Sequence, residues 1–145
     1  MLRHPGLIPL SHQHQHGLAL CVTIDRTASP ESAAGLARRV RNIFDLELRN
    51  HFDIEERILF PAIVSALGPT PLVDQLIAEH RQLEQLVEDT QTARPAALRE
   101  FAAALSEHIR REERELFEDI QRRLPPETLE QLGRSIDAAV VRVCL

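Results

Sequence analysis

Two ten-residue segments of the chain share a pattern of residues that can bind metal ions. HFDIEERILF begins at His51 and HIRREERELF begins at His108, so each segment has a histidine, three intervening residues, Glu-Glu-Arg, one residue and Leu-Phe. Residues four apart on a helix differ by about 40° in direction and about 6 Å in height. His51 and Glu55 therefore project to one side of a helix, and His108 and Glu112 do the same.

Both histidine–glutamate pairs lie on helix faces that are otherwise apolar. Leu48 shares the face of His51, and Leu105 shares the face of His108. Ionised carboxylates are almost never fully buried unless they are paired or bound to a metal ion. A single pair of this kind is usually an ordinary helical ion pair, but two inward pairs predict a metal site.

Two further histidines lie on apolar faces of other helical segments. His80 is aligned with the leucines of AEHRQLEQLV. In the cluster HQHQH, His14 continues the apolar stripe, whereas His12 and His16 are rotated by about 160° from it in opposite senses. We expect His14 to face the core, with His12 or His16 as the alternative.

The turns between helical segments allow the heights of these residues to be compared. Counted from the turn near Arg94, His80 lies 14 residues before and His108 lies 14 after. Counted from Gly68, Glu55 lies 13 residues before and His80 lies 12 after. In an antiparallel hairpin such residues lie at the same height, so we expect them to converge.

The first hairpin fits this register less well. Counted from Ser29, His14 lies 15 residues before and His51 lies 22 after. At 1.5 Å per residue the mismatch is about 10 Å. Either the first loop extends to about Gly35, or the first helix contributes a residue other than His14. His12 fits the register slightly better and the apolar stripe much worse.

The elements that must position these residues are all helical. Proline, glycine and capping residues divide the chain, and Ser29 with Pro30 is typical of a helix start. A bend is expected at Pro61. Five helices are predicted, at about residues 11–28, 33–67, 71–92, 96–124 and 127–143.

We therefore predict one all-α domain over residues 1–145. The first four helices should form an antiparallel up-down four-helix bundle because their connections are short. The C-terminal fifth helix should either cover the bundle or form a homodimer contact.

Charge and composition exclude several other classes of protein. The net charge is −5 and no block of Lys or Arg stands free of acids, so nucleic acid is not expected as a partner. No apolar run approaches the roughly 20 residues that span a bilayer, so we expect no membrane association and a cytoplasmic location. Cys21 and Cys144 are expected to be free thiols.

Four stretches of the sequence together resemble the hemerythrin-like, His-His-Glu (HHE) cation-binding family. They are LSHQHQHGL, HFDIEERILFPAI, AEHRQLEQL and HIRREERELF, and the resemblance covers about residues 8–120. It implies a four-helix bundle that holds two Fe ions joined by an oxo or hydroxo bridge, with Zn or Mn as substitutes. Matched by position, the terminal ligands are His14, His51, His80 and His108, and the bridging carboxylates are Glu55 and Glu112.

The sequence also departs from hemerythrins that carry oxygen. Those proteins have a second histidine one turn after the third-helix histidine, where this chain has Glu84. Their fourth-helix carboxylate falls at the position of Glu113, one residue past Glu112. The pattern is closer to family members with four histidines and two glutamates that are linked to repair of iron centres. Whether Glu84 or Glu113 contacts a metal is left open by the sequence.

The expected function is that of a non-haem di-iron protein that binds or senses O2, NO or iron. Two octahedral ions need roughly twelve bonds and the six side chains supply about eight, which leaves positions for a small diatomic ligand. The Glu-x-x-His signature of ferritin-like proteins is absent from these helices. The alternatives are repair or protection of iron centres, or a structural or signalling bundle whose site is zinc-filled or vacant. An enzymatic activity is left undecided.

Overall fold

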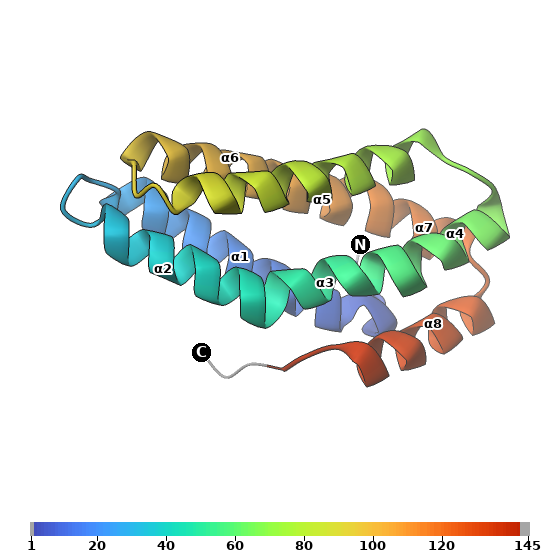
Figure 1. Cartoon of the computed structure of the whole chain (residues 1–145). Helices are drawn as coiled ribbons and strands as arrows, with labels where there is room; N and C mark the ends of the chain where they lie inside the picture. The colour runs from blue at the N-terminus through green and yellow to red at the C-terminus, as the bar shows by residue number, and fades with distance from the viewer. Residues whose placement is uncertain (1, 143–145) are drawn as a thin grey trace.

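The computed structural model describes residues 2–142, which form an antiparallel four-helix bundle with an added C-terminal helix (Figure 1). The all-α prediction is confirmed. The elements in chain order are η1 (Pro5–Leu7), α1 (Ile8–Thr27), α2 (Ala33–Ile43), η2 (Phe44–Leu48), α3 (Arg49–Ile54), η3 (Glu55–Leu59), α4 (Phe60–Leu67), α5 (Pro71–Thr90), α6 (Pro95–Arg111), η4 (Glu112–Leu116), α7 (Phe117–Arg123) and α8 (Pro126–Ala139). None of the helices in this described part combines the length and the apolar character needed to cross a bilayer.

The helix boundaries follow the turn residues of the sequence. The Thr70 side chain accepts a hydrogen bond from the Val73 amide at 3.1 Å, which caps α5. Gly68 has a φ of +86°, a left-handed conformation that glycine adopts without strain. The last helix, expected to reach residue 143, ends at Ala139.

The turn between α1 and α2 differs in one detail from the expected helix start. Ser29 and Ser32 each accept the other's amide proton through their hydroxyl oxygens, at 3.2 and 3.0 Å. This reciprocal pair satisfies two amides as a capping box does. The regular helix nevertheless begins at Ala33, so Pro30 lies in the turn that precedes it rather than at the first helical position.

The second and fourth helices of the bundle each contain a π-helical turn at the repeated segment. These turns, η3 and η4, occupy Glu55–Leu59 and Glu112–Leu116, the same five positions of the repeat. The irregularity expected at Pro61 is present just upstream of it. Because Glu118 takes the place of Pro61 in the second copy, the π turn belongs to the repeated segment and not to the proline.

The π turns redirect the residues that follow them. Phe60 lies nine residues after His51, which on an uninterrupted α-helix is about 180° away from it. Phe117 stands in the same relation to His108. The extra residue of each π turn brings these rings back toward the bundle interior, where Phe60 is 2% and Phe117 0% exposed.

Two apolar clusters fill the interior, one on either side of a band of buried polar residues. The first includes Ile24, Leu83 and Phe101, and the second includes Leu10, Leu76 and Ile120. On each bundle helix the histidine falls between members of the two clusters, so it lies near mid-length.

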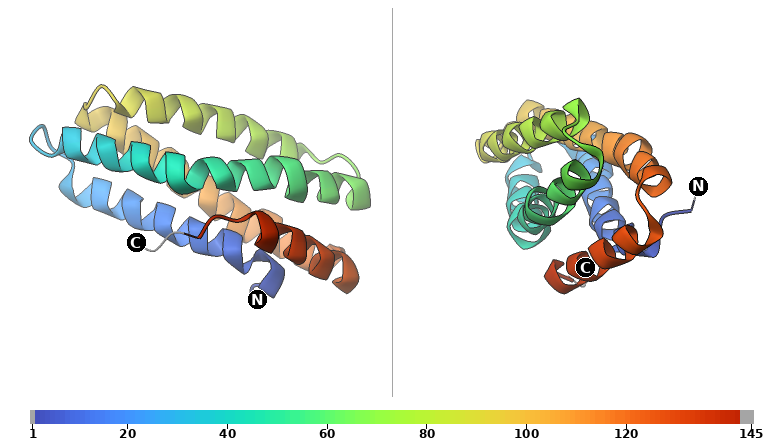
Figure 2. Two further views of the ribbon diagram at one scale, coloured as in Figure 1. Left: turned by 60° about the horizontal axis from the view of Figure 1, so that its bottom comes forward. Right: turned by 90° about the vertical axis from the view of Figure 1, so that its right-hand side faces the viewer.

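The C-terminal helix α8 packs along the outside of the bundle, as the end view in Figure 2 shows. Its residues Leu129, Leu132 and Ile136 are buried in the second apolar cluster. Of the two roles considered for this helix, covering the bundle is therefore present within one chain. The homodimer contact stays a prediction.

One of the two cysteines lies in the described part of the chain. Cys21 is a buried free thiol on α1, and burial raises its pKa above the ordinary value. A buried, protonated thiol is a poor nucleophile. Cys144 lies outside the described residues.

Candidate metal centre

Six polar side chains meet at mid-height inside the bundle. They are His14 from α1, His51 from α3, Glu55 at the start of η3, His80 from α5, His108 from α6 and Glu112 at the start of η4. All six are at most 4% exposed. The structure thus brings together every residue that the sequence marked as a candidate ligand.

The six side chains form two groups of four that share both glutamates. One group is His14, His51, Glu55 and Glu112, and the other is Glu55, His80, His108 and Glu112. Within each group, one nitrogen or oxygen atom per residue lies within 4.8 Å of the others. Two cation-sized positions joined by two carboxylates are the arrangement of a binuclear metal site.

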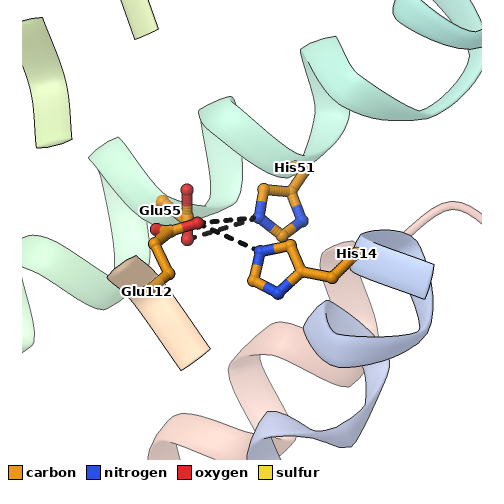
Figure 3. Close-up of side chains that lie close together, drawn as sticks. All are labelled: His14, His51, Glu55 and Glu112. Carbon is orange, nitrogen blue, oxygen red and sulfur yellow. Dashed lines mark hydrogen bonds and ion pairs between the residues drawn. The ribbon is translucent and has the colours of Figure 1, made fainter. Parts of the chain in front are cut away.

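The Nε2 atoms of the histidines face the two carboxylates, as Figure 3 shows for one of the groups. Glu112 Oε1 lies 3.0 Å from His14 Nε2, 3.5 Å from His51 Nε2 and 3.2 Å from His108 Nε2. The oxygens of Glu55 lie 3.3 Å from His51 Nε2 and 3.0 Å from His80 Nε2. Neither carboxylate therefore belongs to one histidine alone.

Four buried polar atoms at this point have no hydrogen-bond partner. They are Nε2 of His51 and of His108, Oε2 of Glu55 and Oε2 of Glu112. Each buried polar atom left without a partner costs about 1–3 kcal/mol. Because all four face the same interior space, a metal ion fits them better than separate hydrogen bonds do.

The two glutamates carry opposite pKa shifts. Burial and repulsion from Glu112 raise the pKa of Glu55 well above its ordinary value. Burial also opposes ionisation of Glu112, but the charge of His108 and the surrounding hydrogen bonds hold its pKa well below the ordinary value. Without a cation the pair therefore shares a proton, since two adjacent buried carboxylates cannot both ionise. A divalent cation can replace that proton.

The second histidine pair is also divided in charge. Burial lowers the pKa of His80 to about 3. Burial acts on His108 in the same direction, but the Glu112 charge and the hydrogen bonds from Glu112 and Glu79 raise its pKa to about 10. A metal ligand must be a neutral imidazole with a free lone pair, so metal binding would release a proton from this half.

The second glutamate of each repeat holds a histidine on a different helix. Glu56 accepts a hydrogen bond from His80 Nδ1 at 2.7 Å, and Glu113 accepts one from His14 Nδ1 at 2.7 Å. A partner at Nδ1 fixes the tautomer that leaves Nε2 available for a metal ion. In each Glu-Glu pair the first residue therefore faces the centre and the second orients a histidine of the neighbouring helix.

The other two histidines are held by the residues that precede His14 and His80 in sequence. Gln13 Oε1 accepts a hydrogen bond from His51 Nδ1 at 3.0 Å, and Glu79 Oε1 accepts one from His108 Nδ1 at 2.7 Å. All four imidazoles are thus oriented in the same way, three by carboxylates and one by an amide.

The sequence analysis did not assign roles to Gln13, Glu56 and Glu79. Two signals were available. Glu56 repeats at the place of Glu113, and Gln13 and Glu79 directly precede inward histidines. Neither signal says which histidine each residue contacts, because that depends on the packing of neighbouring helices.

The structure also answers three questions that the sequence left open. Glu113 orients His14 and belongs to neither group of four. Glu84 is 40% exposed at its side chain and pairs with Arg81 at 3.1 Å, so it lies outside both groups. His14 and not His12 or His16 is at the centre, with its ring 4.5 Å from that of His51.

The register mismatch expected for the first hairpin is therefore smaller than a straight helix implies. The turn ends at Ser32 and does not reach Gly35. A third π turn, η2 (Phe44–Leu48), lies between this turn and His51. Its extra residue lengthens the sequence without adding a full step of height, which takes up part of the mismatch.

Apolar rings close the space around the histidines. Phe52 stacks on His80 with ring centres 4.0 Å apart, and Phe117 stacks on His14 at 5.6 Å. Both phenylalanines are buried. They keep water from the donor atoms and restrict the imidazole rings to one orientation.

The chain is similar to proteins that have been described before. The family model for the hemerythrin HHE cation-binding domain matches residues 9–120. A protein of Nostoc sp. (strain PCC 7120) described as a DNA nickase is 28% identical over 103 residues, which cover 67% of this chain and 29% of that protein. The chain therefore spans less than a third of this relative. No solved structure matches the chain significantly.

Proposed function

The chain belongs to the hemerythrin HHE cation-binding family, and from this premise we propose that it is a non-haem di-iron protein that binds or senses O2, NO or iron. The proposed ligands are His14, His51, His80 and His108 as terminal imidazoles, with Glu55 and Glu112 as carboxylates shared by both ions. One observation carries the proposal: both glutamates belong to two adjacent groups of four buried ligand atoms.

The donor set suits the proposed metal. Imidazole nitrogens and carboxylate oxygens bind Fe, Zn and Mn, whereas soft thiolate ligands would favour other metals. Iron in such a site would supply one-electron redox chemistry and positions open to a diatomic ligand. The four Nδ1 hydrogen bonds hold the imidazoles in place, and Phe52 and Phe117 keep the site dry.

Sensing or handling a small ligand fits the site better than oxygen carriage. Glu84 stands where oxygen carriers have an additional histidine, and it pairs with Arg81 at the surface. Each group of four therefore offers two histidines and the two shared glutamates. This symmetrical supply of ligands supports the proposed comparison with four-histidine, two-glutamate members of the family.

Metal analysis and spectroscopy test the proposal directly. Apoprotein reconstituted with ferrous iron without oxygen should hold about two iron ions per chain. Its absorption spectrum should change on mixing with O2 or NO. Retention of zinc alone, or less than one iron per chain, would contradict a di-iron function. Spectra that ignore both gases while iron content follows the iron supply would favour iron sensing within the proposal.

The nickase similarity does not extend the proposal to nucleic acid. The aligned segment is 29% of that protein, and the activity in its name belongs to the whole of it. The net charge of −5 in this chain also gives no support to phosphate binding.

A further inference from the structure

Two histidines of the HQHQH segment do not reach the centre and lie beside a buried acid. His12 is exposed and His16 is partly exposed on the outer side of α1. His16 Nδ1 lies 2.8 and 3.0 Å from the two carboxylate oxygens of Glu47. His12 and His16 are four residues apart, so their rings project from the same side of the helix one turn apart.

Glu47 is an unusual residue for such a position. It is 2% exposed and lies within the π turn η2, just as Glu55 and Glu112 lie within η3 and η4. Among the described residues, His16 is the side chain that pairs with it. A carboxylate this buried needs a positive partner, and an imidazole beside an open cavity leaves room for a cation to take that role.

A cavity of about 110 Å³ connects these groups with the outside. Its walls are Pro9, His12, Gln13, His16, Glu47, Val140, Val141 and Arg142. Since one water occupies about 30 Å³ in the liquid, the space holds three or four water molecules or a partly hydrated cation. Arg142 is the cationic side chain of the wall, and it is paired with Asp137 of α8.

The cavity is one side chain away from the metal centre. Gln13 lines it and also accepts the hydrogen bond from His51 Nδ1. A rotation of the Gln13 side chain would therefore connect the cavity with the His14–His51 half.

We propose that His16 and Glu47 form a third divalent-cation site, completed by His12 when its exposed ring turns into the cavity, and that this site delivers metal to the centre past Gln13. Imidazole and carboxylate donors suit Fe²⁺, Zn²⁺ and Mn²⁺. The delivery role rests on the proposed function of the centre, whereas cation binding at His16 and Glu47 does not.

The two sites have the properties that delivery requires. The outer site offers at most three side chains and faces solvent, so it should exchange metal rapidly and bind it weakly. The centre offers six buried side chains with oriented imidazoles, so it should bind metal more tightly. Metal therefore moves down a gradient of affinity from the surface to the interior.

Equilibrium dialysis against Zn²⁺ tests the outer site. The natural chain should bind about three Zn²⁺, and the His16→Gln and Glu47→Gln variants about two. His16→Gln keeps an amide that can donate to Glu47, so the fold should be retained, and circular dichroism checks this. Gln15→Ala, exposed on the same helix, is the matched control and should still bind about three. A natural chain that binds two, or a third ion that persists in both variants, would refute the outer site.

A second experiment separates delivery from binding. Apoprotein mixed with Fe²⁺ without oxygen should fill its centre about tenfold more slowly in the His16→Gln variant, with the same final iron content. An unchanged rate would refute delivery. The double variant Glu55→Gln, Glu112→Gln isolates the outer site and should bind about one Zn²⁺. A centre that takes up no metal in the natural chain would contradict the proposed function, and this double variant would still test the outer site.

Discussion

The two halves of the metal centre are built from corresponding residues of the chain. One half comes from α1 and α3 and the other from α5 and α6. The corresponding pairs are His14 and His80, His51 and His108, Glu55 and Glu112, Glu56 and Glu113, and Gln13 and Glu79. Four of the five pairs are chemically identical, so the difference between the halves is concentrated at Gln13 and Glu79.

Glu79 is a charged support for its histidine. Burial alone would raise the pKa of Glu79, but the hydrogen bond and charge of His108 and the charge of Arg111 hold it below the ordinary value. The carboxylate therefore stays ionised beside His108. An ionised partner makes an imidazole a stronger metal ligand.

Gln13 is a neutral support that also has to donate hydrogen bonds. Its amide accepts from His51, and its Nε2 donates to Asn50 Oδ1 at 3.1 Å and to the Val141 carbonyl at 3.4 Å. A carboxylate could not donate to either oxygen. The segment that follows α8 therefore requires an amide here. The repeated segments determine the inward residues, while the surrounding chain determines their supports.

The largest effect should come from removing a residue that both halves share. Glu112→Ala and Glu55→Ala should each reduce the metal content from about two ions to well below one, because each carboxylate lies in both groups of four. Elemental analysis measures the loss. The exposed Glu107→Ala change on α6 is the control and should keep both ions. A variant that loses one ion cleanly would show a terminal role for that glutamate.

A smaller effect should come from removing a residue of one half. His14→Ala should cost about one metal ion, because His14 belongs to a single group. His108→Ala should do the same for the other half. His12→Ala leaves the centre intact and serves as the control. Full retention of iron by the His14 variant would show that the first-helix ligand is another residue.

The difference between Glu79 and Gln13 should appear as unequal metal affinity. Glu79→Gln should weaken the ion of the His80–His108 half about 10- to 100-fold and bring the two affinities closer together. Competition with a chelator gives the two dissociation constants. Glu115→Gln is the matched control, since Glu115 also pairs with Arg111 but lies on the exposed side. Equal affinities in the natural chain would refute the asymmetry.

The smallest effect should come from the outer support of Gln13. Asn50 accepts from the Val141 amide at 2.9 Å and donates to the Ala139 carbonyl at 3.1 Å. Asn50→Ala should therefore destabilise the protein by about 1 kcal/mol, a fall in Tm of about 3 °C. The metal content should stay at its natural value. Calorimetry measures the shift, with the exposed Asn42→Ala as the control. A loss of metal here would mean that the terminal segment supports the centre more strongly than Gln13 alone explains.

The sequence was sufficient to place the six inward residues. Regular spacing gave the apolar stripes, and the turns at Gly68 and Arg94 set the heights of three of the four bundle helices. These properties depend on one helix or one hairpin at a time. The supports Gln13, Glu56 and Glu79 act across helices, so their partners could not be read from spacing alone.

The π turns were the other feature that the sequence analysis missed. It assumed about 100° per residue throughout, which places Phe60 and Phe117 opposite the histidines. Their apolar character at such positions was a signal that the helix changes its winding. The same assumption made the first hairpin look out of register, because η2 had not been foreseen.

Each π turn also means that a long helix is written in two reading frames. The inward positions before Glu55 and those after Leu59 follow the same three- and four-residue steps, but the two series are offset by one residue. An alignment with a bundle of uninterrupted helices would need a one-residue gap inside the helix. A residue deleted there would leave the chain helical and turn every later side chain of that helix away from its present neighbours.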